Sequence, residues 1–283
     1  MKILLIGKKT SHLALRLVEE AKKAKQSLVA VEPGELQIIV STKGFKAKLA
    51  NGKKLLDFDV FYFYAIGKDA LELAELAKYL KSCGKVVVED SLAGGRLPLD
   101  KFDWRQQDIL ATPDYQFFFD FKKRDYNSIK YPAIVKDIHS SRGAGVFKVT
   151  NKTELKKVID RIGTKIIIQK YLPVKSDYRV LVVGNEALGA IERVKSQENV
   201  ASNRKPEKVL AVTVPDSALQ ACVAASRAKG LAIAGVDLLS YRGKYYVWEI
   251  NASPQCRIFE KYTGVNAPAK ILQYLQSLVK TKA

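Results

Sequence analysis

Hydrophobic residues in the first third of the chain recur with two alternating periods. The short apolar runs at residues 2–6 and 60–64 have the length of buried strands. Between them, leucines and alanines of residues 12–25 recur every three or four positions, as on the buried face of a helix. The alternation continues with a strand at 28–31, a helix at 71–80 and a strand at 86–88. Strands that alternate with helices predict a small parallel α/β domain.

An antiparallel ribbon is expected to interrupt this parallel order. Residues 46–50 and 54–56 flank Asn51-Gly52, a dipeptide that favours tight hairpin turns. The ribbon therefore looks like an insertion into the α/β domain.

After Asp90 the pattern changes, with glycines at 94 and 95, Pro98 and a helix expected at 101–110. From residue 131 the order becomes strand, glycine loop, strand, helix and strand. These elements are expected at 133–136, 140–145, 146–150, 154–161 and 165–171, with Thr153 as the cap of the helix. The order predicts a compact α+β lobe.

The last section is also mixed in structure. A hairpin is expected at 178–183 and 187–193 around Gly184-Asn185, followed by strands at 209–214, 236–240 and 244–251 and helices at 216–229 and 267–279. We therefore expect three parts, at residues 1–97, 98–175 and 176–283. A chain of 283 residues is long enough for several subdomains around a shared site.

Composition narrows the class of protein. A hydrophobic content of 47% excludes a disordered basic tail, and the formal net charge of +19 favours anionic partners, such as phosphorylated ligands, acidic proteins or nucleic acid. Apolar runs are too short for a membrane helix, so a cytoplasmic protein is expected. The three cysteines lack the spacing of a zinc site, and we expect buried thiols.

Phosphate binding is expected in the central lobe. The turn after the first strand, residues 7–10, has neither a dinucleotide fingerprint nor a P-loop. The loop around Ser141, Gly143 and Gly145 offers successive backbone N–H groups and a hydroxyl that could surround phosphate oxygens. A plain hairpin turn is the alternative. Lys101 and Lys136 are ordinary lysines when taken singly, and a role in phosphate binding depends on the residues around them.

A second candidate site is a set of hard oxygen donors. Because side chains alternate along a strand, Glu249 and Asn251 share one face while Trp248 points to the other. Asp237 could join them from the neighbouring strand. Two carboxylates and an amide suit Mg²⁺, which binds few protein groups together with phosphates. The alternative is a carboxylate paired with a surface lysine.

A third candidate site is cationic. Arg179 opens the hairpin of the last section and Arg193 ends its second strand, with Asn203 in the polar loop that follows. Arginine can neutralise charge that develops during phosphoryl transfer. The alternative is a cross-strand salt bridge with Asp177 or Glu192.

Taken in order, these segments resemble the RimK-like branch of the ATP-grasp carboxylate–amine ligases. The similarity runs from about residue 100 to the end. The matching segments are 100–102, 134–136, 141–146, 168–172, 177–179, 182–184, 190–193, 203, 234–239, 249–254 and 260–265. The resemblance implies an ATP-grasp fold, with α+β lobes behind an N-terminal Rossmann-like α/β domain.

The resemblance also implies roles for individual residues. ATP would be bound by Lys101, Lys136, Ser141, Gly143, Gly145, Gln169, Lys170, Tyr171, Leu172, Asp177 and Asn203. Mg²⁺ or Mn²⁺ would be held by Asp237, Glu249 and Asn251. Arg179 and Arg193 would steady the transferred phosphoryl group, and Ser253 would contact substrate.

In such ligases a carboxylate attacks the γ-phosphate of ATP, and an amine then displaces phosphate from the acyl phosphate. We therefore expect an amide-forming ligase that adds an amino acid to an acidic protein or small-molecule acceptor, with homo-oligomers possible. The chain differs from the usual residues of this family at Ser140, Lys170, Gln255 and residues 204–207. These differences bear on how the acceptor is recognised. The alternatives are a degenerate ATP-grasp domain that binds nucleotide or nucleic acid without turnover, and an acyl phosphate passed to a thiol or reduced by a partner enzyme.

Overall fold

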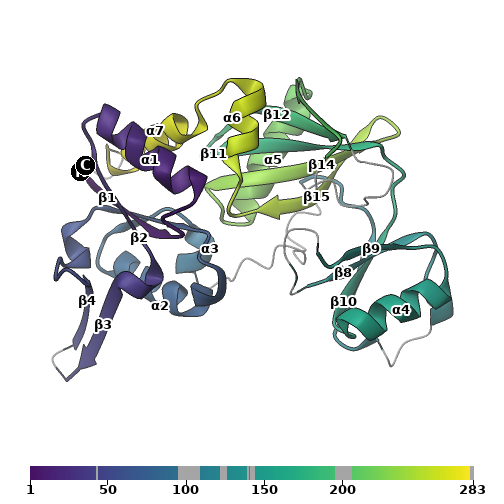
Figure 1. Cartoon of the computed structure of the whole chain (residues 1–283), viewed down its shortest axis with the longest axis horizontal. Coiled ribbons are helices and arrows are strands. Elements are labelled where there is room, and N and C mark those ends of the chain that lie inside the picture. Colours follow the sequence, from purple (N-terminus) through teal and green to yellow (C-terminus); the bar gives the residue numbers. More distant parts are fainter. Residues whose placement is uncertain are drawn as a thin grey trace.

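The computed structural model describes residues 1–42, 44–94, 109–121, 126–138, 140, 144–194 and 206–280. Their strands form three principal sheets and one two-stranded ribbon (Figure 1). Most of the helix expected at 101–110 lies outside these residues. No helix in the described ranges is both long and apolar enough to cross a bilayer.

The N-terminal sheet confirms the parallel α/β pattern. Its order is β2-β1-β5-β6, and all three pairings are parallel. Alternate residues of β1 point to opposite faces, so Ile3 and Leu5 pack with α1 while Leu4 and Ile6 pack with α2. The elements are β1 (Lys2–Gly7), α1 (His12–Lys23), β2 (Ser27–Val31), β5 (Val60–Tyr64), α2 (Ala70–Ser82), β6 (Val86–Val87) and α3 (Asp90–Ala93).

The inserted ribbon is present, but its predicted pairing is wrong. β3 (Leu36–Ser41) pairs antiparallel with β4 (Gly44–Leu49). Asn51-Gly52 does form a turn, yet the chain beyond it makes only one bridge, from Lys54 to Lys48. The uncharged, β-branched run of β3 offers a longer pairing partner than the lysine-rich segment after the turn.

The central lobe holds a four-stranded sheet in the order β7-β10-β8-β9, and α4 packs against β8 and β10. The predicted helix cap is wrong: Asn151, not Thr153, accepts the backbone N–H of Glu154. The Glu154 carboxylate accepts hydrogen bonds from the backbone N–H and the hydroxyl of Thr150, which completes the cap. The elements are β7 (Tyr115–Phe118), β8 (Ala133–Asp137), β9 (Val146–Val149), α4 (Lys152–Ile162) and β10 (Ile166–Lys170).

The C-terminal sheet has five antiparallel strands in the order β13-β12-β11-β14-β15. α5 covers one face, and α6 and α7 cover part of the other. The elements are β11 (Ser176–Val183), β12 (Glu186–Val194), β13 (Lys208–Val212), α5 (Asp216–Ala228), β14 (Ile233–Tyr241), β15 (Lys244–Asn251), α6 (Cys256–Thr263) and α7 (Ala267–Lys280). Short 3₁₀ helices span Pro33–Glu35, Leu55–Asp57, Gly67–Asp69 and Tyr126–Ser128.

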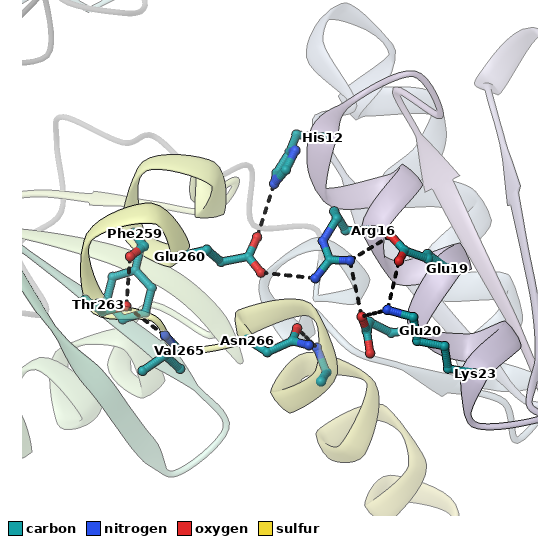
Figure 2. A network of polar contacts seen from close by, with 11 residues as sticks. His12, Arg16, Glu19, Glu20, Lys23, Phe259, Glu260, Thr263, Val265 and Asn266 are labelled. Carbon is teal, nitrogen blue, oxygen red and sulfur yellow. Dashed lines mark hydrogen bonds and ion pairs between the residues drawn. The ribbon is translucent and has the colours of Figure 1, made fainter.

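The N-terminal and C-terminal parts share one core. Residues of β1 and α1 belong to the same apolar cluster as residues of β11, α6 and α7. At its edge, Glu260 of α6 accepts from His12 at 3.1 Å and pairs with Arg16 at 3.6 Å, both on α1 (Figure 2). Because this core is apolar and continuous, it holds the N-terminal sheet against the C-terminal sheet.

The cysteines are all free thiols. Cys222 and Cys256 are buried as expected, and burial raises the pKa of each to about 12. Cys83 is exposed, which corrects the expectation of three buried thiols. It follows the last residue of α2, where the helix ends at the surface.

Gly7 is the point at which β1 can pass close to β5. Its φ is +149°, and a Cβ atom there would overlap the carbonyl oxygen of Tyr64. We expect Gly7→Ala to lower the free energy of unfolding by about 2 kcal/mol or more, because backbone atoms must shift. Gly34→Ala is the control, since no atom lies within 4 Å of its added methyl group. Urea unfolding measures both; equal midpoints for the two variants would contradict the explanation.

Candidate functional site

The candidate site lies on the face of the C-terminal sheet that α6 and α7 leave partly uncovered. Along β11, Leu181 and Val183 belong to the core shared with these helices. Asp177 and Arg179 have the same parity and therefore point to the same side. The apolar half of this face thus continues into a charged half.

Four charged side chains form a continuous chain across β12, β11 and β14. Arg179 donates to both oxygens of Asp237, each at 2.7 Å. Arg193 donates from Nε to Asp177 at 2.6 Å, and its Nη2 lies 3.1 Å from Asp237 Oδ1. The cross-strand salt bridge between Arg193 and Asp177, which the sequence offered as the alternative to a role in phosphoryl transfer, is therefore present.

This chain of charges is largely shielded from water. Asp237 and Asp177 are each 2% exposed, and Arg193 is 5% exposed. Burial alone would favour the neutral carboxyl of Asp237, but Arg179 and Arg193 outweigh it and lower its pKa. Burial likewise opposes the charged form of Arg193, yet Asp237 and Asp177 raise its pKa. The carboxylate of Asp237 and the guanidinium of Arg193 are therefore held ionised by their charged neighbours.

Glu249 and Asn251 lie on the strand next to Asp237. Glu249 is the register partner of Asp237, and Asn251 is the partner of Gly235. The amide nitrogen of Asn251 is buried and has no hydrogen-bond partner among the described residues. Register therefore places the three predicted metal ligands on adjacent strands.

A bulge in β15 changes the position expected for Trp248. Asp237 pairs with Glu249 but Leu238 pairs with Val247, which leaves Trp248 as the extra residue. The expected alternation does not hold there. Instead, the Trp248 ring receives the ammonium of Lys136 from β8, 3.6 Å from the ring centre. The sequence contains no signal for this contact, because a bulge is not visible in the hydrophobic pattern.

Lys136 is thus brought to the C-terminal sheet although it belongs to the central lobe. It is 5% exposed. A second link joins the same two regions, since Val247 N donates to Ala111 O at 2.8 Å. The Lys136–Trp248 contact places a buried cation of the central sheet one residue from Glu249.

Residues 169–172, predicted to bind ATP, comprise the last two residues of β10 and the two residues after it. Gln169 is buried, and its Nε2 donates to Pro113 O at 3.3 Å while its Oε1 has no partner among the described residues. Lys170 is exposed and lies 3.7 Å from Asp114. The Tyr171 ring receives Lys148 at 4.2 Å, and Leu172 is buried. The backbone N–H of Lys170 is already donated to Asp114 O.

The glycine loop is described only at its base. Gly145 O accepts from Asp137 N at 2.9 Å, and a Cβ at Gly145 would overlap Ser140. Gly145 therefore lets the backbone at this position lie close to Ser140 and Asp137. The other predicted residues Lys101, Ser141, Gly143 and Asn203 lie outside the described residues.

Ser253 joins the loop after β15 to the N-terminal sheet. Its Oγ accepts from Ala65 N at 3.0 Å, and Tyr64 Oη donates to Pro254 O at 3.1 Å. Ala65 has a positive φ of 52°. These N-terminal residues were not predicted to lie at the site. The sequence near the end of β5 contains no signal for a contact with a residue 188 positions away.

The donor set fits a divalent ion in chemical type. Carboxylate and amide oxygens are hard ligands, and rotating the Asn251 amide by half a turn exchanges its unpartnered nitrogen for its oxygen. The described residues contain no group of three His, Cys, Asp or Glu placed to hold a metal, and both Asp237 oxygens are occupied by Arg179. A metal at Asp237 would therefore compete with Arg179 for this carboxylate.

Removing the central carboxylate should destabilise the sheet. Asp237→Asn leaves the buried Arg193 and the half-buried Arg179 beside a neutral amide, and we expect the free energy of unfolding to fall by about 3–5 kcal/mol. Asp160→Asn, at an exposed position of α4, is the control and should change stability by less than about 0.5 kcal/mol. Urea unfolding at pH 7 measures both. A loss of stability no larger than that of the control would refute the charge pairing.

Comparison with known proteins identifies the family from the sequence and the fold from solved structures. A family model of the RimK-like ATP-grasp domain matches residues 117–275. The ribosomal protein bS6–L-glutamate ligase of Salmonella paratyphi B is 32% identical over 151 residues, which cover 51% of this chain and 50% of that relative. The chain thus spans about half the length of the curated relatives it matches.

Two solved structures share the fold. The ATP-grasp ligase PsnB, complexed with a minimal precursor, has a TM-score of 0.75 at 18% identity, with 98% of this chain and 99% of that chain covered. The D-alanine–D-alanine ligase of Bacillus anthracis, complexed with ATP, has a TM-score of 0.66 at 17% identity, with 100% and 99% covered. The mixed α/β architecture predicted from the sequence is therefore that of ATP-grasp proteins. With more than half of its residues matched by the family model, the chain belongs to the RimK-like ATP-grasp family.

Proposed function

We propose that the protein is an ATP-dependent carboxylate–amine ligase that forms an amide bond through an acyl phosphate. One observation carries the proposal: Asp237 and Glu249 are register partners on a face that also holds Arg179 and Arg193. Lys136 reaches the same sheet from the central lobe. Phosphoryl transfer needs positioned positive charge more than a protein nucleophile, and this set supplies it.

The proposed reaction has two steps. A carboxylate oxygen of the acceptor attacks the γ-phosphorus of ATP, and ADP leaves. The amine nitrogen then attacks the acyl carbon and forms the C–N bond. The bond between that carbon and the phosphate oxygen breaks, phosphate leaves with the electron pair, and the nitrogen loses a proton. Arg179 and Arg193 would stabilise the equatorial oxygens of the transferred group, because a guanidinium forms two parallel hydrogen bonds to such oxygens.

The nucleotide is proposed to lie between the central and C-terminal sheets. Lys136 would contact its phosphates together with Lys101 and Asn203, and the loop with Ser141, Gly143 and Gly145 would cover them. Gln169, Lys170, Tyr171 and Leu172 would flank the adenine, and Asp177 the ribose. Asp177 carries the ion pair with Arg193, so a ribose contact would use its remaining lone pairs.

Asp237, Glu249 and Asn251 are the residues proposed to hold Mg²⁺ or Mn²⁺. A divalent ion bound there would neutralise negative charge on the phosphates of ATP. The chain's own contribution is the exchange at Asp237, where Arg179 would be released from the carboxylate and become available to an anion. PsnB has been solved with Mg and ADP, which supports this pair of ligands for the fold.

For the substrates we propose an amino acid as amine and an acidic polypeptide or small acid as acceptor. The net charge of +19 favours an acidic acceptor. The sequence relative named above acts, by its name, on ribosomal protein bS6 with L-glutamate, and PsnB was solved with a precursor peptide. Ser253, next to the N-terminal residue Ala65, is the proposed substrate contact.

Residues 1–97, 98–175 and 176–283 are proposed as the three units of this enzyme, since each range contains one principal sheet. The cytoplasm, where ATP and free amino acids are abundant, is the proposed location.

Nucleotide binding without turnover is the second candidate function. The observation that favours it is the engagement of both Asp237 oxygens by Arg179, with which a metal ion would have to compete. A chain in which the pair never opens would bind nucleotide weakly and release no ADP.

The ligase proposal is tested by ADP release. Purified protein is incubated with ATP, Mg²⁺, pooled amino acids and a panel of acidic peptides, and products are identified by their mass increase. We expect ADP formation that depends on both substrates, and a fall of about 100-fold or more in kcat for Glu249→Gln.

Glu72→Gln, at an exposed position of α2, is the matched control and should keep the wild-type rate. Equal ADP release from wild type and Glu249→Gln would refute the assignment. ADP release in no mixture, with nucleotide still bound, would favour the second candidate function.

A further inference from the structure

The β3–β4 ribbon is the most unusual surface outside the candidate site. It extends from the N-terminal sheet on the side away from the central lobe (Figure 1). Ile38, Ile39 and Val40 are consecutive and are 42%, 38% and 77% exposed. Isolated exposed apolar residues are ordinary, but three in succession on one strand indicate a surface that is covered in use.

The outer edge of β3 is open. The ribbon contains two strands, and no other described strand pairs with β3. Soluble proteins usually protect an edge strand with charges, proline or a covering element. β3 has none of these, since its sequence is LQIIVS. An extended chain could therefore add to this edge by main-chain hydrogen bonds.

Charge selects the chemistry of that added chain. Residues 36–54 contain five lysines and no Asp or Glu. Lys46 is exposed and is the register partner of Ile39, while Lys48 is the partner of Gln37. Their side chains therefore share a face with Gln37 and Ile39, one strand from the open edge, at a spacing of about 4.8 Å. Acidic side chains of an added strand would meet this face.

Two other occupants are disfavoured by the same residues. Nucleic acid is bound through aromatic platforms, but the Phe45 ring is already packed on Tyr79 at 4.1 Å. A second copy of the chain would bring two lysine-rich ribbons together, which like charges oppose. An acidic polypeptide satisfies the open edge, the apolar residues and the lysines together.

We propose that the β3–β4 ribbon is a docking site for an extended acidic polypeptide segment, which adds to the edge of β3. In so far as that polypeptide is the acceptor, the inference rests on the proposed ligase function. The ribbon lies on the far side of the N-terminal sheet from the central lobe, so the bound partner is a chain long enough to reach both places.

The test uses binding without ATP, so that it is independent of turnover. The probe is a fluorescein-labelled octapeptide of alternating glutamate and valine, and its counterpart has lysine in place of glutamate. Fluorescence anisotropy should show binding of the acidic peptide only. The variant Lys46→Glu with Lys48→Glu should weaken binding about 10-fold or more.

The matched control is Lys156→Glu with Lys157→Glu on α4, which makes the same change of charge at exposed positions. It should bind within about 2-fold of wild type. Hydrogen exchange on addition of the peptide should slow at amides of Leu36–Ser41. Circular dichroism should be unchanged in both variants. If Lys46→Glu with Lys48→Glu does not fold, Lys46→Gln with Lys48→Gln replaces it.

Equal loss of affinity in the ribbon and control variants would overturn the proposal, as would protection of amides elsewhere only. If hydrogen exchange at the β3 amides slows as the protein concentration rises in the absence of peptide, a second copy of the chain binds this edge. That result would also overturn the proposal. Displacement of the probe from the ribbon by an RNA oligonucleotide but not by polyglutamate would assign the surface to nucleic acid. Failure of ADP release with the docking results intact would refute only the proposed function.

Discussion

Mutual neutralisation of buried charges is the constraint on which this site depends. Asp177, Arg193, Asp237 and Arg179 alternate in sign along one path across three strands. Each would be costly to bury alone, and breaking one pair leaves an uncompensated charge. The path has no net charge, so the sheet can carry it beside an apolar core. In the proposed function, a phosphorylated ligand with its metal ion would enter by exchanging partners along the same path.

The surrounding fold keeps this path in place. The helices α6 and α7 cover the apolar half of the sheet face and join it to α1, and the His12–Glu260–Arg16 contacts lie at the edge of that junction (Figure 2). Ser253 and Pro254 are tied to β5 through Ala65 and Tyr64. The central lobe reaches the site through Lys136 and Trp248. All three parts of the chain therefore contribute to one place.

Much of the fold was predictable because strand and helix periods are local properties of the sequence. β5 and β15 begin and end at the predicted residues, and the parallel sheet follows from strands alternating with helices. The ribbon partner was not predictable from the Asn51-Gly52 signal, because pairing of β3 with β4 depends on competition between two neighbouring segments. The cap at Asn151 depended on a reciprocal contact through Glu154. For the site, strand alternation predicted that Glu249 and Asn251 share a face, and Asp237 is the register partner of Glu249 on the neighbouring strand. The Trp248 bulge and the hydrogen bond from Ala65 to Ser253 depend on tertiary contacts. The roles of these residues in ligation stay predictions.

We propose that Asp237 exchanges a guanidinium for a metal ion when nucleotide binds. A crystal structure of the chain with Mg²⁺ and a non-hydrolysable ATP analogue tests this exchange. We expect the metal on Asp237 and Glu249, with Arg179 moved from the carboxylate to the γ-phosphate. Arg179 still bound through both hydrogen bonds to Asp237, with the nucleotide phosphates located away from this face of the sheet, would contradict the account.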